Sequence, residues 1–150
     1  MAKFVYTLQN ILTIKYKLED QAKIEYGIQK MAYEQQVDKL EELKLRKLQY
    51  ERLQKQHLQS RLVFHEIERT SRAIDTMKER ISEQAVRVAA ARRKLEQATQ
   101  VMNQAMMERK AHEKLKENAF ESFKKELVQI ESKEVDELVS YKYNKGNEDV

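Results

Sequence analysis

The three histidines of this chain, His57, His65 and His112, are its best candidates for metal binding or acid–base catalysis. Two histidines near the middle of the chain without paired carboxylates make a poor zinc site. The sequence has no cysteine, which excludes disulfides and thiolate metal sites. It also lacks a phosphate-binding glycine loop, an HExxH helix and a Ser-His-Asp pattern. We therefore expect no enzyme, with no catalytic, cofactor-binding or metal-binding residues.

Basic residues gather in one part of the second half of the chain. The cluster consists of Arg80, Arg87, Arg92, Arg93 and Lys94. We expect it to be a solvated helix face, with a protein-docking surface as the alternative. Glutamates interrupt the cluster and no aromatic residues are interleaved with it, so we expect no nucleic-acid partner. Residues 116–150 carry nine acidic and six basic side chains, which also argues against nucleic acid.

Apolar residues recur at alternating steps of three and four from Ile67 to Ala105, and we call these positions the seam. Its twelve positions are Ile67, Thr70, Ile74, Met77, Ile81, Gln84, Val88, Ala91, Leu95, Ala98, Met102 and Ala105. Ten of the twelve are apolar, the exceptions being Thr70 and Gln84. A mean spacing of about 3.5 residues predicts a helix packed lengthwise along another helix.

The composition favours long helices over an ordinary globular domain. Charged residues make up 36% of the chain, and it contains no proline and two glycines. High charge combined with this periodicity is typical of coiled coils. No apolar run approaches the roughly 20 residues that span a bilayer, so we expect no transmembrane segment. We predict an all-α fold in which two long helices form an antiparallel coiled-coil hairpin, the second helix longer than the first.

The expected bounds follow from where the apolar periodicity starts and lapses. We predict a helix over about 3–57, a turn over about 56–63, a second helix over about 62–143, one domain over 1–143 and a frayed polar tail over 144–150. A turn near Thr70 is the alternative, and Ser60, Thr70 or Ser71 could cap the second helix. The apolar positions expected to face the seam from the first helix are Phe4, Leu8, Ile11, Leu18, Ala22, Tyr26, Met31, Leu40, Leu43, Tyr50 and Leu53.

The unequal helix lengths predict an unpaired end on the second helix. If the turn is centred near residue 60, position i faces position 119 − i, so Phe4 would lie opposite Leu115. The seam would change phase near 108–112 and continue as Ala111, Leu115, Ala119, Phe123, Leu127 and Ile130. Everything after Lys116 would form an overhang of about 25 residues, roughly 40 Å long. Its apolar residues, Phe120, Phe123, Leu127 and Ile130, are then expected to bind a partner.

Both ends of the chain resemble the flagellar export protein FliJ family. The N-terminal motif is FVYTLQNILTIKYKLEDQA, residues 4–22. The C-terminal motifs are MERKAHEKLKENAFESFKKE, residues 107–126, and ESKEVDELVSYKY, residues 131–143. The order of these motifs and the length between them match the family pattern. The chain departs from it at the turn, where many relatives carry glycine.

The resemblance implies a stalk-like coiled coil in the flagellar type III export apparatus. The implied partners are the hexameric export ATPase, which the stalk stimulates, the export gate protein in the membrane, and export chaperones. The implied location is cytoplasmic, at the inner face of the membrane. The implied ATPase contact falls at the end that bears both termini, on the overhang residues Phe120, Phe123, Leu127 and Ile130. The implied gate contact falls on Ala73, Ile74, Met77 and Ile81, which lie on or beside the seam. The alternative function is a self-associating structural coiled coil without a motor partner.

Overall fold

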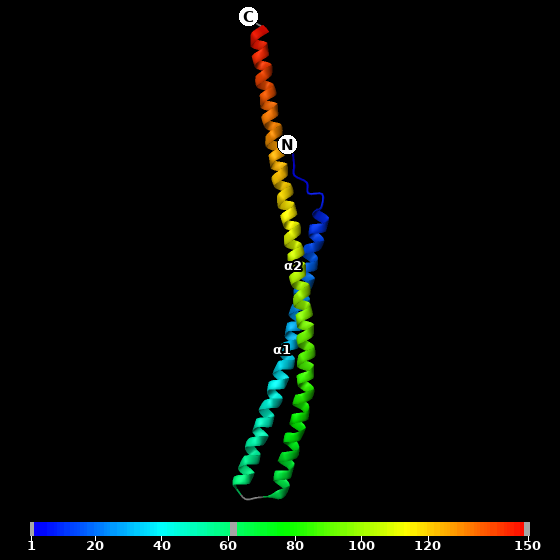
Figure 1. Ribbon diagram of the computed structural model, residues 1–150, viewed down its shortest axis with the longest axis vertical. Coiled ribbons are helices and arrows are strands. Elements are labelled where there is room, and N and C mark those ends of the chain that lie inside the picture. The colour runs from blue at the N-terminus through cyan, green and yellow to red at the C-terminus, as the bar shows by residue number, and fades with distance from the viewer. Residues whose placement is uncertain (1, 61–62, 149–150) are drawn as a thin grey trace. The chain divides into compact units, whose positions relative to one another are not determined.

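The computed structural model describes residues 2–60 and 63–148, and in this range the chain forms two long α-helices (Figure 1). Helix α1 spans Gln9–Gln59 and helix α2 spans Phe64–Glu148. The helices pack against each other and α2 is the longer, which confirms the predicted fold class. Without proline, neither helix contains a residue that must break it. No helix in the described residues is long and apolar enough to cross a membrane.

The helix ends differ from those expected. Helix α1 begins at Gln9, and its first turn closes through the Leu12 amide, which donates to the Leu8 carbonyl at 3.2 Å. Residues 2–8, which we call the N-terminal arm, lie outside the helix. Aromatic and β-branched residues dominate the arm and are poor helix formers, which accounts for the later start. At the other end, α2 continues to Glu148, through most of the polar stretch expected to be a tail.

The two helices are joined between Gln59 and Phe64. The Ser60 hydroxyl donates to the Gln56 carbonyl at 2.9 Å, so it closes the end of α1 and does not cap α2. The alternative turn near Thr70 is wrong, because Thr70 is buried inside α2. Residues 61 and 62, on which part of the predicted turn and the predicted start of the second helix fall, lie outside the described residues.

The chain divides into two compact units, and each contains part of both helices. The terminal unit comprises Met1–Glu19 and Ala105–Val150. The loop unit comprises Asp20–Gln104. In the terminal unit Gln9 pairs with Lys116 and Glu19 with Arg109, so the helices are antiparallel there.

In the loop unit, the predicted seam of α2 is correct. All of its positions from Ile67 to Met102 are buried or half-buried, including the polar Thr70 and Gln84. The Gln84 side-chain amide donates to the Gln36 backbone carbonyl at 2.9 Å and to Gln36 Oε1 at 2.8 Å. This pair fixes the local register, because it places Gln36 opposite Gln84.

The predicted seam of α1 is wrong at several positions. Five residues expected to face α2 are exposed: Leu8, Ile11, Leu18, Met31 and Leu53. Most of the positions that are buried or half-buried follow alternating steps of three and four: Leu12, Lys15, Glu19, Ala22, Tyr26, Gln29, Tyr33, Gln36, Leu40, Leu43, Lys47, Tyr50, Gln54 and His57. Half of these side chains are polar or charged. Long polar side chains can cover apolar surface with their stems while their heads reach water.

The terminal unit corrects the expected phase change and register. The inward positions of α2 continue without interruption as Ala105, Arg109, His112, Lys116, Ala119 and Phe123, all at least half-buried. Ala111 and Leu115, which were expected to face α1, are exposed. The expected pairing of Phe4 with Leu115 is also wrong, because Phe4 contacts Phe120 and Phe123. The apolar pattern predicted the wrong inward positions because Arg109, His112 and Lys116, which are polar, face α1 here.

Candidate partner-docking surfaces

The N-terminal arm is held to α2 by an aromatic cluster within the terminal unit. The Phe4 ring centroid lies 5.1 Å from that of Phe120 and 5.4 Å from that of Phe123. Lys124 Nζ lies 4.6 Å from the Phe120 centroid, in cation–π range. Two of the four residues predicted as an unpaired docking surface therefore already have a partner, namely the arm of the same chain.

An open groove of about 470 Å³ lies beside this cluster. Its lining residues are Phe4, Gln9, Leu12, Tyr16, Glu113, Lys116, Glu117 and Phe120. The groove combines aromatic and aliphatic surface with both signs of charge at its rim. Such a surface suits a peptide segment better than a small molecule, because it is open along its length and has no enclosed pocket.

An ionic network joins α1 to α2 in the same unit. Arg109 binds Glu19 through two hydrogen bonds, with Nε 2.5 Å from Glu19 Oε2 and Nη2 3.1 Å from Glu19 Oε1. Its third donor, Nη1, lies 3.0 Å from Glu113 Oε2. A second ion pair links Lys15 Nζ to Glu108 Oε2 at 2.9 Å. Paired arginine and glutamate at inward positions specify which helix residues face each other, since a shift would bury unpaired charge.

The network shifts the pKa values of three titratable groups. The Tyr16 hydroxyl donates to a carboxylate oxygen of Glu113, and this bond together with Arg109 lowers the pKa of Glu113 below 4.5. The same bond, with partial burial, raises the pKa of Tyr16 above 10.0. Hydrogen bonds from Arg109 to Glu19 and Glu113 raise the pKa of the guanidinium further. All three groups therefore keep their usual charge states at neutral pH, and the network is electrostatic rather than proton-transferring.

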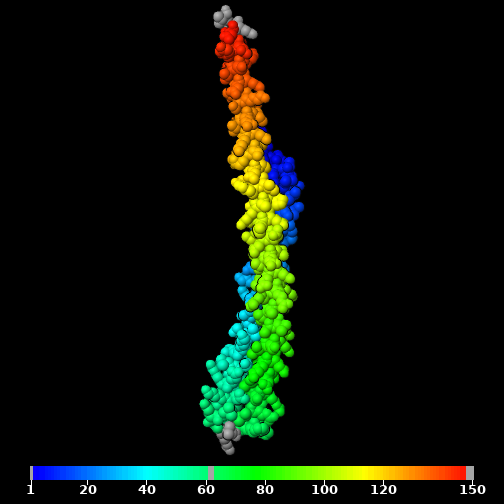
Figure 2. Space-filling view, viewed as in Figure 1, coloured from blue at the N-terminus to red at the C-terminus, as the bar shows by residue number. Residues whose placement is uncertain are grey.

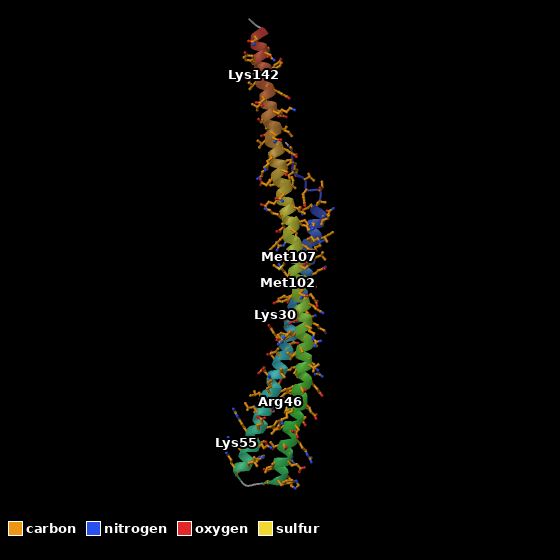
Figure 3. The ribbon with its side chains drawn as sticks, viewed as in Figure 1. Lys30, Arg46, Lys55, Met102, Met107 and Lys142 are labelled. Carbon is orange, nitrogen blue, oxygen red and sulfur yellow. The ribbon has the colours of Figure 1, made fainter. Side chains whose placement is uncertain are left out.

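Among the described residues, no second helix lies beside the last part of α2. Every residue from 128 to 147 is exposed, and we call this stretch the free segment. The free segment follows the part of α2 that the arm covers (Figure 1), and no other part of the chain lies over it in the space-filling view (Figure 2). Lys142 lies on this segment (Figure 3). Its exposed apolar side chains are Val128, Ile130, Val135, Leu138, Val139, Tyr141 and Tyr143. Helical geometry places Val128, Val135 and Val139 within about 40° of one line along the helix.

The four residues predicted to bind a partner therefore fall into two groups. Ile130 is exposed on the free segment, whereas Leu127 is half-buried just before it. Phe120 and Phe123 lie under the arm. Sequence reasoning missed Val135, Leu138 and Val139 as docking candidates, although their apolar character and spacing were visible.

The four residues predicted to contact a membrane gate lie at the seam of the loop unit. Ile74 and Met77 are buried, and Ala73 and Ile81 are half-buried. Helices α1 and α2 draw apart toward their connection (Figure 1), yet Ile74 and Met77 remain buried. These two side chains can meet a partner only if the helices separate there.

Neither the basic cluster nor the histidines form a ligand- or metal-binding site among the described residues. Arg80, Arg87, Arg92, Arg93 and Lys94 are all exposed. Arg92 lies 6.0 Å from the centroid of the Tyr33 ring and donates to its hydroxyl at 3.4 Å, so this arginine is engaged within the loop unit. His57 lies 3.7 Å from Glu66. Across residues 2–60 and 63–148, no group of three potential ligands is placed to hold a metal ion.

Comparison with protein families matches residues 4–148 to the family model described as "Flagellar FliJ protein". The matched span includes the end motifs at 4–22, 107–126 and 131–143. No curated protein and no solved structure matches the chain.

Proposed function

We propose that this chain, which belongs to the FliJ family of flagellar proteins, is the central stalk that binds and stimulates the hexameric flagellar export ATPase. Family membership makes it a non-catalytic structural component of flagellar export. The free segment of α2 is the part that we assign to the ATPase. The export gate and the export chaperones are the further partners that we propose.

The observation that carries the proposal is the exposed apolar surface of the free segment. Twenty residues of helix extend over roughly 30 Å. An isolated helix of this length is only marginally stable in water, and in proteins tertiary packing supplies most helical stability. A partner that surrounds the segment would bury Val128, Val135 and Val139 on one side and Ile130 on the other. The central opening of a ring ATPase offers such an all-round environment.

Stimulation requires that the stalk distinguish between conformations of the ring subunits. A single helix has different side chains on each face, so it contacts six equivalent subunits unequally. Unequal contact lowers the free energy of some subunit conformations relative to others and shifts their populations. The valine line and the opposite, Ile130-bearing face supply that asymmetry. The chain thus changes nucleotide turnover without taking part in the chemistry.

The test replaces the valine line with charge. Val135→Asp combined with Val139→Asp should abolish stimulation of ATP hydrolysis by the purified hexamer. The matched control, Gln129→Asp with Ser140→Asp, adds aspartates to the same segment about 100° around the helix and should stimulate normally. All four positions are exposed, so circular dichroism should report equal helix content in both variants. Equal stimulation by both would refute the assignment.

We assign the gate contact to Ala73, Ile74, Met77 and Ile81, reached by separation of the helices in the loop unit. Binding there would bring the chain to the inner face of the membrane. Because the chain has no cysteine, cysteines introduced at Gln36 and Gln84 can be joined by a reducible bis-maleimide. The cross-link should block gate binding, reduction should restore it, and ATPase stimulation should stay unchanged throughout. Gate binding by the cross-linked chain would refute this contact.

A further inference from the structure

The N-terminal arm occupies a surface of α2 that has the features of a peptide-binding site. The arm is not helical, although the rest of the described chain is almost entirely so. Phe4 is half-buried against Phe120 and Phe123, whereas its neighbour Val5 is 73% exposed. Phe4 and the half-buried Tyr6, whose ring centroids lie 6.5 Å apart, therefore anchor an extended segment whose intervening residue is exposed. Aromatic pairs prefer the tilted arrangement seen here, with ring planes at 62° and 49°.

The arm and this surface do not complement each other completely. The Tyr6 hydroxyl is buried, and no described residue provides it with a hydrogen-bond partner. Buried polar groups in native proteins are usually paired, and an unpaired one weakens the arrangement that buries it. Phe120 also stays partly exposed under the arm. The groove beside it, lined by Phe4, the start of α1 and α2, remains open. The surface thus offers apolar contact that the arm leaves unused, and the arm buries a hydroxyl that the surface leaves unpaired.

We propose that the Phe120–Phe123 surface is a binding site for an extended peptide segment of another protein that carries an aromatic side chain. The arm is the resident occupant in the free chain, and it shows the chemistry that the site accepts. An incoming segment of the same kind displaces Phe4 and also contacts the groove beside it. Charged groups at the rim, Lys116 and Glu117, and the ammonium of Lys124 over Phe120 favour a segment with polar residues beside its aromatic anchor.

Exchange is feasible because the arm is a tethered ligand with few contacts. A tethered segment acts at a high effective concentration, so it excludes weak competitors and yields to stronger ones. Release of Phe4 leaves the start of α1 closed, because the carbonyls that accept its first hydrogen bonds belong to Tyr6 and Leu8 and not to Phe4. The ion pair of Glu19 with Arg109 holds the helices together whether the arm is bound or released.

The test supplies the arm as a separate peptide. A synthetic peptide of residues 2–8 is titrated into the full-length chain, and binding is followed by NMR of isotope-labelled phenylalanine rings. The Phe4→Ala chain should bind the peptide at least tenfold more tightly than the unmodified chain, because its own arm no longer fills the site. A Val5→Ala chain, altered at the exposed neighbour, should behave like the unmodified chain. A peptide carrying the same Phe4→Ala change should not bind.

Three outcomes would overturn the proposal. The first is equal peptide affinity for the unmodified and Phe4→Ala chains. The second is unchanged binding when Phe120→Ala and Phe123→Ala are added to the Phe4→Ala chain. The third is a dimer of the unmodified chain that Phe4→Ala abolishes, since arms from neighbouring copies would then fill the site. Circular dichroism checks that each variant keeps its helices.

Discussion

The ionic network of Glu19, Arg109 and Glu113 should contribute far more to stability than its exposed counterparts. The Glu19 side chain is 4% exposed and that of Arg109 is 19% exposed. Removing one partner of a buried pair costs about 3–5 kcal/mol, because the other charge is left uncompensated. In Glu19→Ala, Arg109 keeps its 3.0 Å bond to Glu113, so we expect a loss at or just below the lower end of that range, about 2–3 kcal/mol.

The matched control is the exposed pair of Arg72 and Glu68 on α2, which are 2.7 Å apart and four residues apart in sequence. Glu68→Ala should cost less than about 0.5 kcal/mol, as for other exposed pairs. Urea denaturation followed by circular dichroism measures both. A loss in Glu19→Ala no larger than that in Glu68→Ala would refute the reasoning.

A double variant separates the charge effect from the packing effect. Glu19→Leu combined with Arg109→Leu removes both buried charges and keeps apolar volume at the inward positions. Replacing a buried ion pair in this way is often neutral or stabilising by about 1–4 kcal/mol. The double variant should therefore be at least as stable as the unmodified chain. If it is as unstable as Glu19→Ala, burial of an uncompensated charge is not the cause of the loss.

Three further perturbations have defined outcomes. The lowered pKa of Glu113 adds stability that is present above pH 4.5 and is lost as pH falls through the folded pKa. Tyr16→Phe removes the main cause of this shift. It should therefore move acid unfolding to higher pH in a circular dichroism titration. Leucine at both Gln36 and Gln84 should raise the free energy of unfolding in urea by about 1–2 kcal/mol, since two buried amides become apolar contacts. Gly27→Ala should raise it by about 0.5–1 kcal/mol, because alanine favours the helix interior over glycine and the added Cβ meets nothing within 4 Å. A decrease in the free energy of unfolding would contradict the apolar contact expected at Gln36 and Gln84 in the first case, and the free space around Gly27 in the second.

The sequence was sufficient to predict the inward face of α2, because apolar residues mark its seam. Ten of twelve positions are apolar, and the two exceptions, Thr70 and Gln84, find partners without disturbing the spacing. Helix α1 lacks that signal. Its inward face includes Lys15, Glu19 and Gln29, whereas Met31 points away from α2. Hydrophobicity alone therefore selected the wrong face over part of α1.

The candidate surface was predictable in kind but not in detail. Phe120 and Phe123 were predicted to lie on the unpaired overhang, as apolar residues that bind a partner. Their occupation by Phe4 depends on the register and on where α1 begins, and neither has a strong local signal. The aromatic and β-branched run Phe4–Thr7 was the available clue, because such residues disfavour helix. Reading it as an extended arm would have placed Phe4 several residues further along α2.

The gate assignment has an energetic consequence, because Ile74 and Met77 are among the most deeply buried large side chains described. Exposing both side chains costs about 3–6 kcal/mol, at about 1.5–3 kcal/mol each. The open state, in which the helices are separated, is therefore rare. The apparent affinity for the gate is reduced in proportion to the fraction of molecules in that state. Gln36 lies opposite Gln84. Seven residues further along α1 and seven residues back along α2, the same register places Leu43 opposite Met77. Leu43→Ala should therefore destabilise the hairpin yet tighten gate binding by about tenfold, if about 1.4 kcal/mol of the lost packing is removed from the opening cost. Surface plasmon resonance against the isolated gate domain measures this, with Leu45→Ala, an exposed neighbour, as the control. Weaker or unchanged binding by Leu43→Ala would mean that the gate does not use these buried residues, because only a buried site gains affinity when its cover is loosened.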